Sequence, residues 1–222
     1  DALVLLVPET FKPENSKGKA SATKTTAPHS MQDLIAQAMS DGDFDAKLGK
    51  ILHIYRHTLT QATRLVLVGA GDGSTKSIKS AVTTAVAGLK SNGSKKLVIS
   101  LNLVDGTDAA SAQAAFFAAA DASYVYTTTK PKADARKFTH ITVAVRKDAM
   151  SATQLIATQA YIAPAISGIE YAKEWGNRPA NHATPTLLGK AAQSLAKYKN
   201  LKVEVLGLKE VSKLGMGSFM SV

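Results

Sequence analysis

The feature that most constrains the fold is a series of short apolar runs that alternate with helical patterns along residues 1–150. Five of the runs have the length of a strand and are bounded by turn residues: Ala2–Val7, Ile51–Tyr55, Leu65–Val68, Leu97–Leu101 and Ile141–Val145. Several are continuously apolar, which is typical of strands that are buried on both faces. The alternation therefore predicts an α/β fold, with a sheet covered by helices.

Three helices are expected between these strands. The first runs from the N-cap Ser30 to about Met39, and the third is alanine-rich and runs from Asp108 to about residue 122. The second begins near Ser74 or Thr75 and ends before a left-handed stop at Asn92-Gly93. One stripe of the second helix is apolar and should face the sheet: Ile78, Val82, Ala85, Val86 and Leu89.

A different pattern follows the fifth strand. From Ser151 to about Trp175 apolar residues recur with helical spacing, at Leu155, Ile156, Ile162, Ile166 and Ile169. This pattern predicts a long connecting helix, which Pro164 should kink because proline has no amide hydrogen. A turn over Asn177–Asn181 and a helix with N-cap Thr184 and Pro185 at its first position come next.

The remaining segments define the expected domains. Val203–Leu206 is interpreted as a strand, Lys209–Leu214 as a short helix and Met216–Val222 as the beginning of a strand. These elements are too few to close a core. We therefore expect an α/β domain over 1–150, a linker helix over 151–175 and the incomplete beginning of a second α/β domain over 176–222. The polar stretch from Glu9 to Pro28 is expected to be an exposed loop.

Composition bounds the function. The 222 residues carry a net charge of +10, from 27 basic and 17 acidic residues, and include no cysteine. Disulfides, thiolate zinc sites and cysteine nucleophiles are therefore excluded within these residues. The charge is spread along the chain, which favours a solvated basic surface, with nucleic-acid contact as the alternative. No apolar stretch approaches the roughly 20 residues of a membrane span, so the expected location is cytoplasmic, with no membrane partner.

The loop Gly69–Gly73 lies between a predicted strand and a helix, where backbone amides can cradle a phosphate. Its pattern is G-x-G-x-G, unlike the dinucleotide pattern, and Lys76-Ser77 is misplaced for a phosphate-binding P-loop. We favour a tight turn and keep an anion site as the alternative.

His53 and His57 are four residues apart, as in helical zinc motifs, but they fall on or beside a predicted strand. Glu170 and Glu174 share a helix face, and with Lys173 beside them they are interpreted as an ion-paired surface.

Asp41, Asp43 and Asp45 suggest a calcium loop, but Leu52 stands where that loop needs a glutamate, so we predict a turn. No G-x-S-x-G motif occurs. No catalytic, metal-binding or cofactor-binding residue is therefore predicted within the chain.

Two segments near the end resemble the leucyl aminopeptidase, or cytosol aminopeptidase, family. Trp175–Pro185 matches the family pattern N-x-P-x-N-x-x-T-P, and Leu214–Gly217 matches its L-G-M-G segment. Upstream, Gly42–Gly49 is similar to G-D-F-x-G-K-x-G, with Ala46 in place of a glycine. Arg64–Gly69 resembles a strand that leads into G-L-G.

The resemblance implies a macro-domain-like N-terminal domain, a linker helix and a C-terminal domain that holds two divalent metals, Mn or Zn. The implied activity is hydrolytic release of N-terminal residues from peptides, by enzymes that assemble as hexamers. The metal-ligand motif N-T-D-A-E-G-R is absent from residues 1–222, so this segment is expected to bind no metal and to be inactive alone. Two alternatives stay open for the basic N-terminal domain: DNA binding, and binding of a phosphate ligand such as ADP-ribose at Gly69–Gly73.

Overall fold

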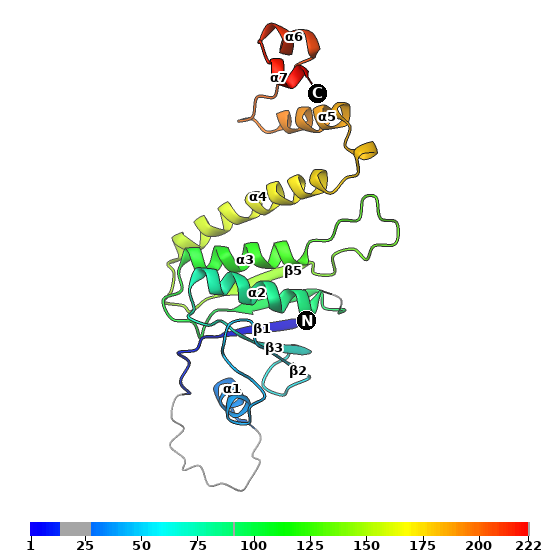
Figure 1. The fold of residues 1–222 in the computed structure, drawn as a ribbon. Helices are drawn as coiled ribbons and strands as arrows, with labels where there is room; N and C mark the ends of the chain where they lie inside the picture. The colour runs from blue at the N-terminus through cyan, green and yellow to red at the C-terminus, as the bar shows by residue number, and fades with distance from the viewer. Residues whose placement is uncertain (14–27, 91, 222) are drawn as a thin grey trace. The chain divides into compact units, whose positions relative to one another are not determined.

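The computed structural model describes residues 1–13, 28–90 and 92–221 (Figure 1). The chain divides into two compact units. Unit 1 comprises Asp1–Thr127 and Lys132–Glu170, and unit 2 comprises Thr128–Pro131 and Tyr171–Val222. Of the exposed loop predicted between Glu9 and Pro28, residues 14–27 lie outside the described residues.

Unit 1 is built on a five-stranded sheet with the order β2-β3-β1-β4-β5. The strands are β1 (Ala2–Val7), β2 (Ile51–Tyr55), β3 (Arg64–Gly69), β4 (Lys96–Ser100) and β5 (His140–Ala144). β1 is parallel to β3 and β4, β5 is parallel to β4, and β2 is antiparallel to β3. Each of the five strands predicted within residues 1–150 is confirmed to within one residue at either end, and so is the mixed α/β fold class.

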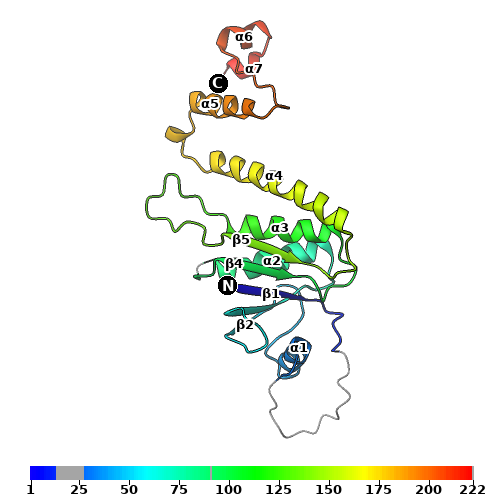
Figure 2. The same ribbon diagram turned by 180° about the vertical axis from the view of Figure 1, so that it is seen from behind.

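Helices cover both faces of this sheet. α2 (Thr75–Leu89) and α3 (Ala109–Ser123) lie on one face, and α1 (Met31–Ser40) lies on the other (Figures 1 and 2). The order of the strands explains this arrangement. The connections through α2 and α3 cross the sheet in one direction, whereas the connection through α1 runs from β1 to β3 in the opposite direction. Because parallel crossovers are right-handed, the two directions place their helices on opposite faces.

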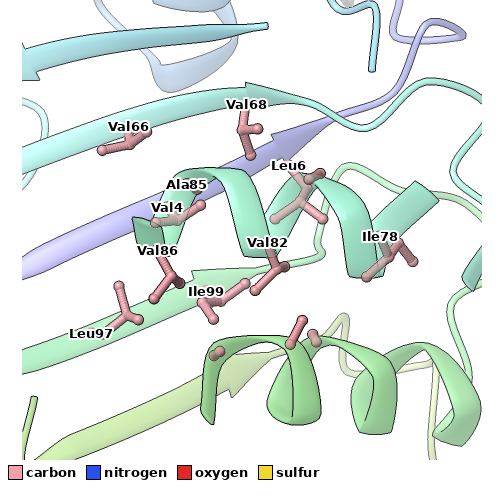
Figure 3. Packing of buried hydrophobic residues seen from close by; sticks show 14 of the residues in the cluster. Val4, Leu6, Val66, Val68, Ile78, Val82, Ala85, Val86, Leu97 and Ile99 are labelled. Atoms are coloured by element: carbon pink, nitrogen blue, oxygen red, sulfur yellow. The ribbon is translucent and has the colours of Figure 1, made fainter. Parts of the chain in front are cut away.

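The central strand β1 contributes to a hydrophobic core on each face of the sheet. Val4 and Leu6 belong to the cluster beneath α2 and α3, whereas Leu5 and Val7 belong to the cluster beneath α1. Figure 3 shows Val4 and Leu6 beside Val82 of α2. The whole predicted stripe of α2 is buried: Ile78, Val82, Ala85, Val86 and Leu89. Burial on both faces accounts for the unbroken apolar sequence of β1.

Side chains cap the first turns of α1 and α2, as predicted for Ser30. Ser30 accepts a hydrogen bond from the Asp33 amide at 3.1 Å, and Ser74 accepts one from the Ser77 amide at 3.3 Å. The left-handed stop was predicted at Asn92-Gly93, and of these two residues Gly93 has no positive φ. The side chain of Asn92 instead accepts a hydrogen bond from the Ser94 amide at 3.1 Å. The Asn92 side chain thus contributes to the turn that follows α2.

The long predicted helix is α4 (Ala152–Gly176), and its helical assignment continues through Pro164. Of its predicted apolar stripe, Ile162 is buried whereas Leu155, Ile156 and Ile169 are exposed. Beyond α4, unit 2 consists of short helices: η1 (Ala180–His182), α5 (Pro185–Ser194), η2 (Leu195–Lys197), α6 (Leu208–Lys213) and α7 (Gly217–Met220). The predicted starts of α5 and α6 are confirmed.

Two predicted strands in unit 2 are wrong. Val203–Leu206 is assigned to no strand, and α7 occupies most of Met216–Val222. A strand is stabilised by hydrogen bonds to a neighbouring strand. The described part of unit 2 contains no strand that could pair with either segment. Their apolar composition alone therefore does not make these segments strands.

Close backbone packing fixes the end of β3. The Gly69 amide donates to the Lys50 carbonyl at 2.8 Å, and the Gly69 carbonyl accepts from the Gly49 amide at 3.0 Å. A Cβ atom on Gly69 would lie 2.0 Å from the carbonyl oxygen of Lys47. Only glycine fits this position, so the glycine-containing segment Gly42–Gly49 and the end of β3 pack directly against each other.

We predict that Gly69→Ala lowers the free energy of unfolding by at least about 2 kcal/mol, because the methyl group overlaps backbone atoms that cannot rotate away. Gly93→Ala is the matched control, since a Cβ atom there meets nothing within 4 Å and its φ is not positive. Urea denaturation of both variants measures the difference. Equal stability of the two variants would contradict the packing described for Gly69.

Candidate functional site

The Gly69–Gly73 loop uses its own amides to hold its shape. The amides of Gly69, Ala70, Gly71 and Gly73 donate to the carbonyls of Lys50, Val7, Ala46 and Ala70, respectively, at 2.8–3.2 Å. Gly71 and Gly73 have φ values of 55° and 72°, which favour glycine. These interactions support the tight-turn interpretation, because amides that are already bonded within the protein do not point at a phosphate.

One residue of this loop, Asp72, carries an acidic side chain close to the start of α2. Asp72 accepts a hydrogen bond from the Ser74 amide at 3.0 Å. The hydroxyl of Ser77 and the amide of Ser74 hold the pKa of Asp72 down to about 2. Asp108 acts similarly at α3, where bonds from Ser111 lower its pKa. Both helix N-termini thus carry a carboxylate of the chain itself, which disfavours a bound anion.

The two histidines do not form a metal pair. His53 is exposed on β2, and the Nδ1 atom of His57 accepts a hydrogen bond from the Leu59 amide at 3.1 Å. His57 lies beyond the end of β2, after Arg56 with a φ of 54°, so the two histidines share neither a strand nor a helix face. Across residues 1–13, 28–90 and 92–221, no three histidine or acidic side chains gather in a way that could hold a metal ion.

Glu170, Glu174 and Asp45 have structural partners. Glu170 pairs with Arg136 at 2.5 Å, and Glu174 pairs with Arg178 at 3.1 Å. Asp45 accepts a hydrogen bond from the Lys47 amide at 3.0 Å, and this bond is the main cause of its lowered pKa. The predicted ion pairing and the predicted aspartate turn are therefore what the structure contains.

The segment that resembles the family pattern at 177–185 ends one helix and begins the next. The Asn177 side chain donates to the Lys173 carbonyl at 2.7 Å, at the end of α4. Pro179 precedes η1, Thr184 accepts from the Leu187 amide at 3.4 Å, and Pro185 is the first residue of α5. In this chain the motif residues shape the connection between α4 and α5.

Leu214–Gly217 also forms a helix end. Gly215 has a φ of 68° directly after α6. Its amide donates to Ser212 at 3.0 Å, and the Met216 amide donates to Val211 at 3.3 Å. This pair of bonds is a Schellman motif, which explains the glycine at position 215.

The structure adds one interaction that the sequence did not predict. Arg136 donates to the carbonyls of Ala120 and Ser123 at 3.2 and 3.3 Å, in addition to its pair with Glu170. It lines a groove of about 580 Å³ formed by α3, β5 and the unit 1 part of α4. The partners of Arg136 are 13 to 34 residues away in sequence, so no local pattern indicates them.

None of the described helices is both long enough and apolar enough to cross a membrane.

Comparisons with known proteins identify relatives for this fold. The model of the N-terminal domain of the cytosol aminopeptidase family matches residues 4–133. Probable cytosol aminopeptidases from Polaromonas sp. and Albidiferax ferrireducens are 46% and 44% identical over 85% and 100% of this chain. These alignments cover 36% and 42% of the two relatives, so the chain spans about two fifths of their length.

Two solved structures share the fold. A mutant of tomato leucine aminopeptidase superposes with a TM-score of 0.74 at 21% identity, covering 97% of this chain and 43% of its own. The bottromycin maturation enzyme BotP in complex with Mn gives 0.68 at 17% identity, covering 97% of this chain and 40% of its own. Because the family model matches more than half of the chain and curated relatives align with its whole length, the protein belongs to the cytosol aminopeptidase family.

Proposed function

We propose that this chain is the N-terminal, non-catalytic part of a metal-dependent leucyl aminopeptidase that removes N-terminal residues from peptides. The observation that carries the proposal is the alignment of the whole chain with probable cytosol aminopeptidases more than twice its length. Residues 1–150 are the macro-like N-terminal domain, 151–175 the linker helix and 176–222 the beginning of the catalytic domain. The parent enzyme is a cytoplasmic hexamer in this proposal.

The proposal assigns two divalent metals, Mn or Zn, to parts of the parent outside residues 1–222. A related fold, BotP, is described in complex with Mn. The described residues here do not fit such a centre, because they bring no three metal-ligating side chains together. We therefore derive no metal-dependent step from this chain.

The surface of unit 2 supports its assignment to a larger domain. Among its described residues only Val211 is buried, at 5% exposure. Many of its large apolar side chains are exposed: Leu187, Leu188, Tyr198, Leu201, Val205, Leu206, Leu208, Leu214, Met216, Phe219 and Met220. Exposed apolar surface of this extent marks an interface. In the proposal, the rest of the catalytic domain covers it.

We predict that the purified 222-residue chain releases no p-nitroaniline from leucine p-nitroanilide with added Mn, because it brings no metal-binding cluster to its substrate. The full-length parent should hydrolyse the same substrate, and a chelator should stop it. Turnover by the 222-residue chain would overturn the non-catalytic assignment. Absence of turnover by the parent would overturn the aminopeptidase assignment.

A second candidate function is nucleic-acid binding by unit 1, and the placement of its basic residues favours it. β3, β4 and β5 begin at Arg64, Lys96 and His140, and parallel pairing puts these residues at one edge of the sheet. Tyr55 pairs with Arg64, so the next residue, Arg56, reaches the same edge. Lys95 is adjacent as well. Basic groups on one edge attract the phosphates of a nucleic acid.

We predict that duplex DNA binds unit 1 with an affinity that falls as salt rises, because phosphate contacts release counterions. The double variant Lys95→Glu with Lys96→Glu should reduce the slope of log affinity against log salt by about 2. Lys76→Glu with Lys79→Glu on α2 is the matched control, with equal charge change away from this edge. Fluorescence anisotropy measures both, and a salt-independent affinity or equal effects of the two pairs would reject this function.

A further inference from the structure

Asn92 is the one asparagine in the sequence that is followed by glycine. It lies just after α2, where its backbone amide donates to the Leu89 carbonyl at 3.2 Å. Gly93 has no Cβ atom to shield its backbone nitrogen from the side-chain amide of Asn92. Gly93 is also exposed, and a Cβ atom built on it would meet nothing within 4 Å. The pair is therefore accessible to water and open to an internal reaction.

The fold also activates the side chain of Asn92. Its Oδ1 atom accepts a hydrogen bond from the Ser94 amide at 3.1 Å, which holds the side-chain carbonyl against the peptide bonds that follow it. The same donor stabilises the negative charge that Oδ1 gains when a nucleophile adds to Cγ. Ser94 is fully buried, at 0% exposure, and its hydroxyl accepts from Nη1 of Arg64 at 3.1 Å. The activating amide is therefore fixed in place.

We propose that Asn92 is a site of spontaneous deamidation. The nitrogen of Gly93 loses its proton to water and adds to Cγ of Asn92, the bond from Cγ to Nδ2 breaks, and Nδ2 takes up a proton and leaves as ammonia. The product is a cyclic imide that joins the two residues. Water then opens the imide at either of its carbonyl groups, which gives aspartate or isoaspartate at position 92. The reaction needs only water, and the proposal does not depend on the proposed function of the chain.

The reaction alters the segment Asn92–Lys95, which leads into β4. Both products carry a carboxylate, so the chain gains a negative charge beside the basic residues at the beginning of β4. Isoaspartate also routes the backbone through the side-chain carbon, which lengthens the chain by one atom. The segment is held on both sides of this change, because Ser94 bonds Arg64 and the Lys95 carbonyl accepts from the Thr139 amide at 2.8 Å. The isoaspartyl chain is therefore less stable than the original one.

Peptide mapping by mass spectrometry follows the reaction, because each deamidation replaces an amide by a heavier acid. The 222-residue chain is incubated in mildly alkaline buffer, and conversion of Asn92 is compared with that of Asn200, an exposed asparagine followed by leucine. We expect Asn92 to convert at least tenfold faster. Isomerisation at the Asp-Gly pairs leaves the mass unchanged and does not interfere. Equal rates at the two asparagines would overturn the proposal.

Gly93→Ala tests the attack by the Gly93 nitrogen. The added methyl group has open space, so the variant should fold, and it should slow conversion of Asn92 at least tenfold. Gly168→Ala, an exposed position on α4 with equally open space, is the matched control and should leave the rate unchanged. Equal rates in the two variants would overturn the assignment of the nucleophile and with it the proposal.

A peptide with the sequence of residues 90–95 isolates the effect of the fold. Because the fold exposes Gly93 and supplies the Ser94 donor, the folded chain should convert at least as fast as this peptide. A tenfold slower rate in the folded chain would overturn the activation.

Thermal unfolding measures the consequence of the reaction. The fully converted chain should melt at a lower temperature than the fresh chain, whereas Gly93→Ala aged for the same time should not. An unchanged melting temperature after full conversion would contradict the loss of stability assigned to isoaspartate.

Discussion

The pairing of β1 on both of its edges is the constraint on which unit 1 depends. β1 is hydrogen-bonded to β3 and to β4, and its side chains enter the cores on both faces of the sheet. A strand in this position must be apolar at nearly every residue, as Ala2–Val7 is. The central position of β1 also determines the direction in which each later connection crosses the sheet. The positions of α1, α2 and α3 on their faces follow from that direction and from the handedness of crossovers.

The fold of unit 1 was predictable because its signals are local. Short apolar runs indicate its strands, and Ser30, Ser74 and Asp108 mark the beginnings of its helices. Unit 2 was less predictable because a strand also requires a neighbour. Val203–Leu206 has the composition of a strand, but the described part of unit 2 offers it no partner.

The sequence interpretation of the candidate residues rested on local spacing. Spacing alone placed His53 and His57 on or beside a strand, and it indicated turns for the aspartates and for Gly69–Gly73. The groove along β5 had no sequence signal, because its walls come from α3, β5 and α4, and because Arg136 joins partners far apart in the chain. Such sites depend on tertiary packing rather than on local pattern.

The segments that resemble the family's motifs act in this chain as connections and as close backbone contacts. Gly69 has no side chain, so the backbone of Lys47 can lie directly against it, and Gly215 ends α6.

The central claim is that unit 1 closes its own cores whereas unit 2 does not. Amide hydrogen exchange of the intact 222-residue chain tests it most directly. The account predicts slow exchange in β1, β3 and β4 and fast exchange across α5, α6 and α7. Equal protection of both groups, lost in one cooperative transition, would contradict it.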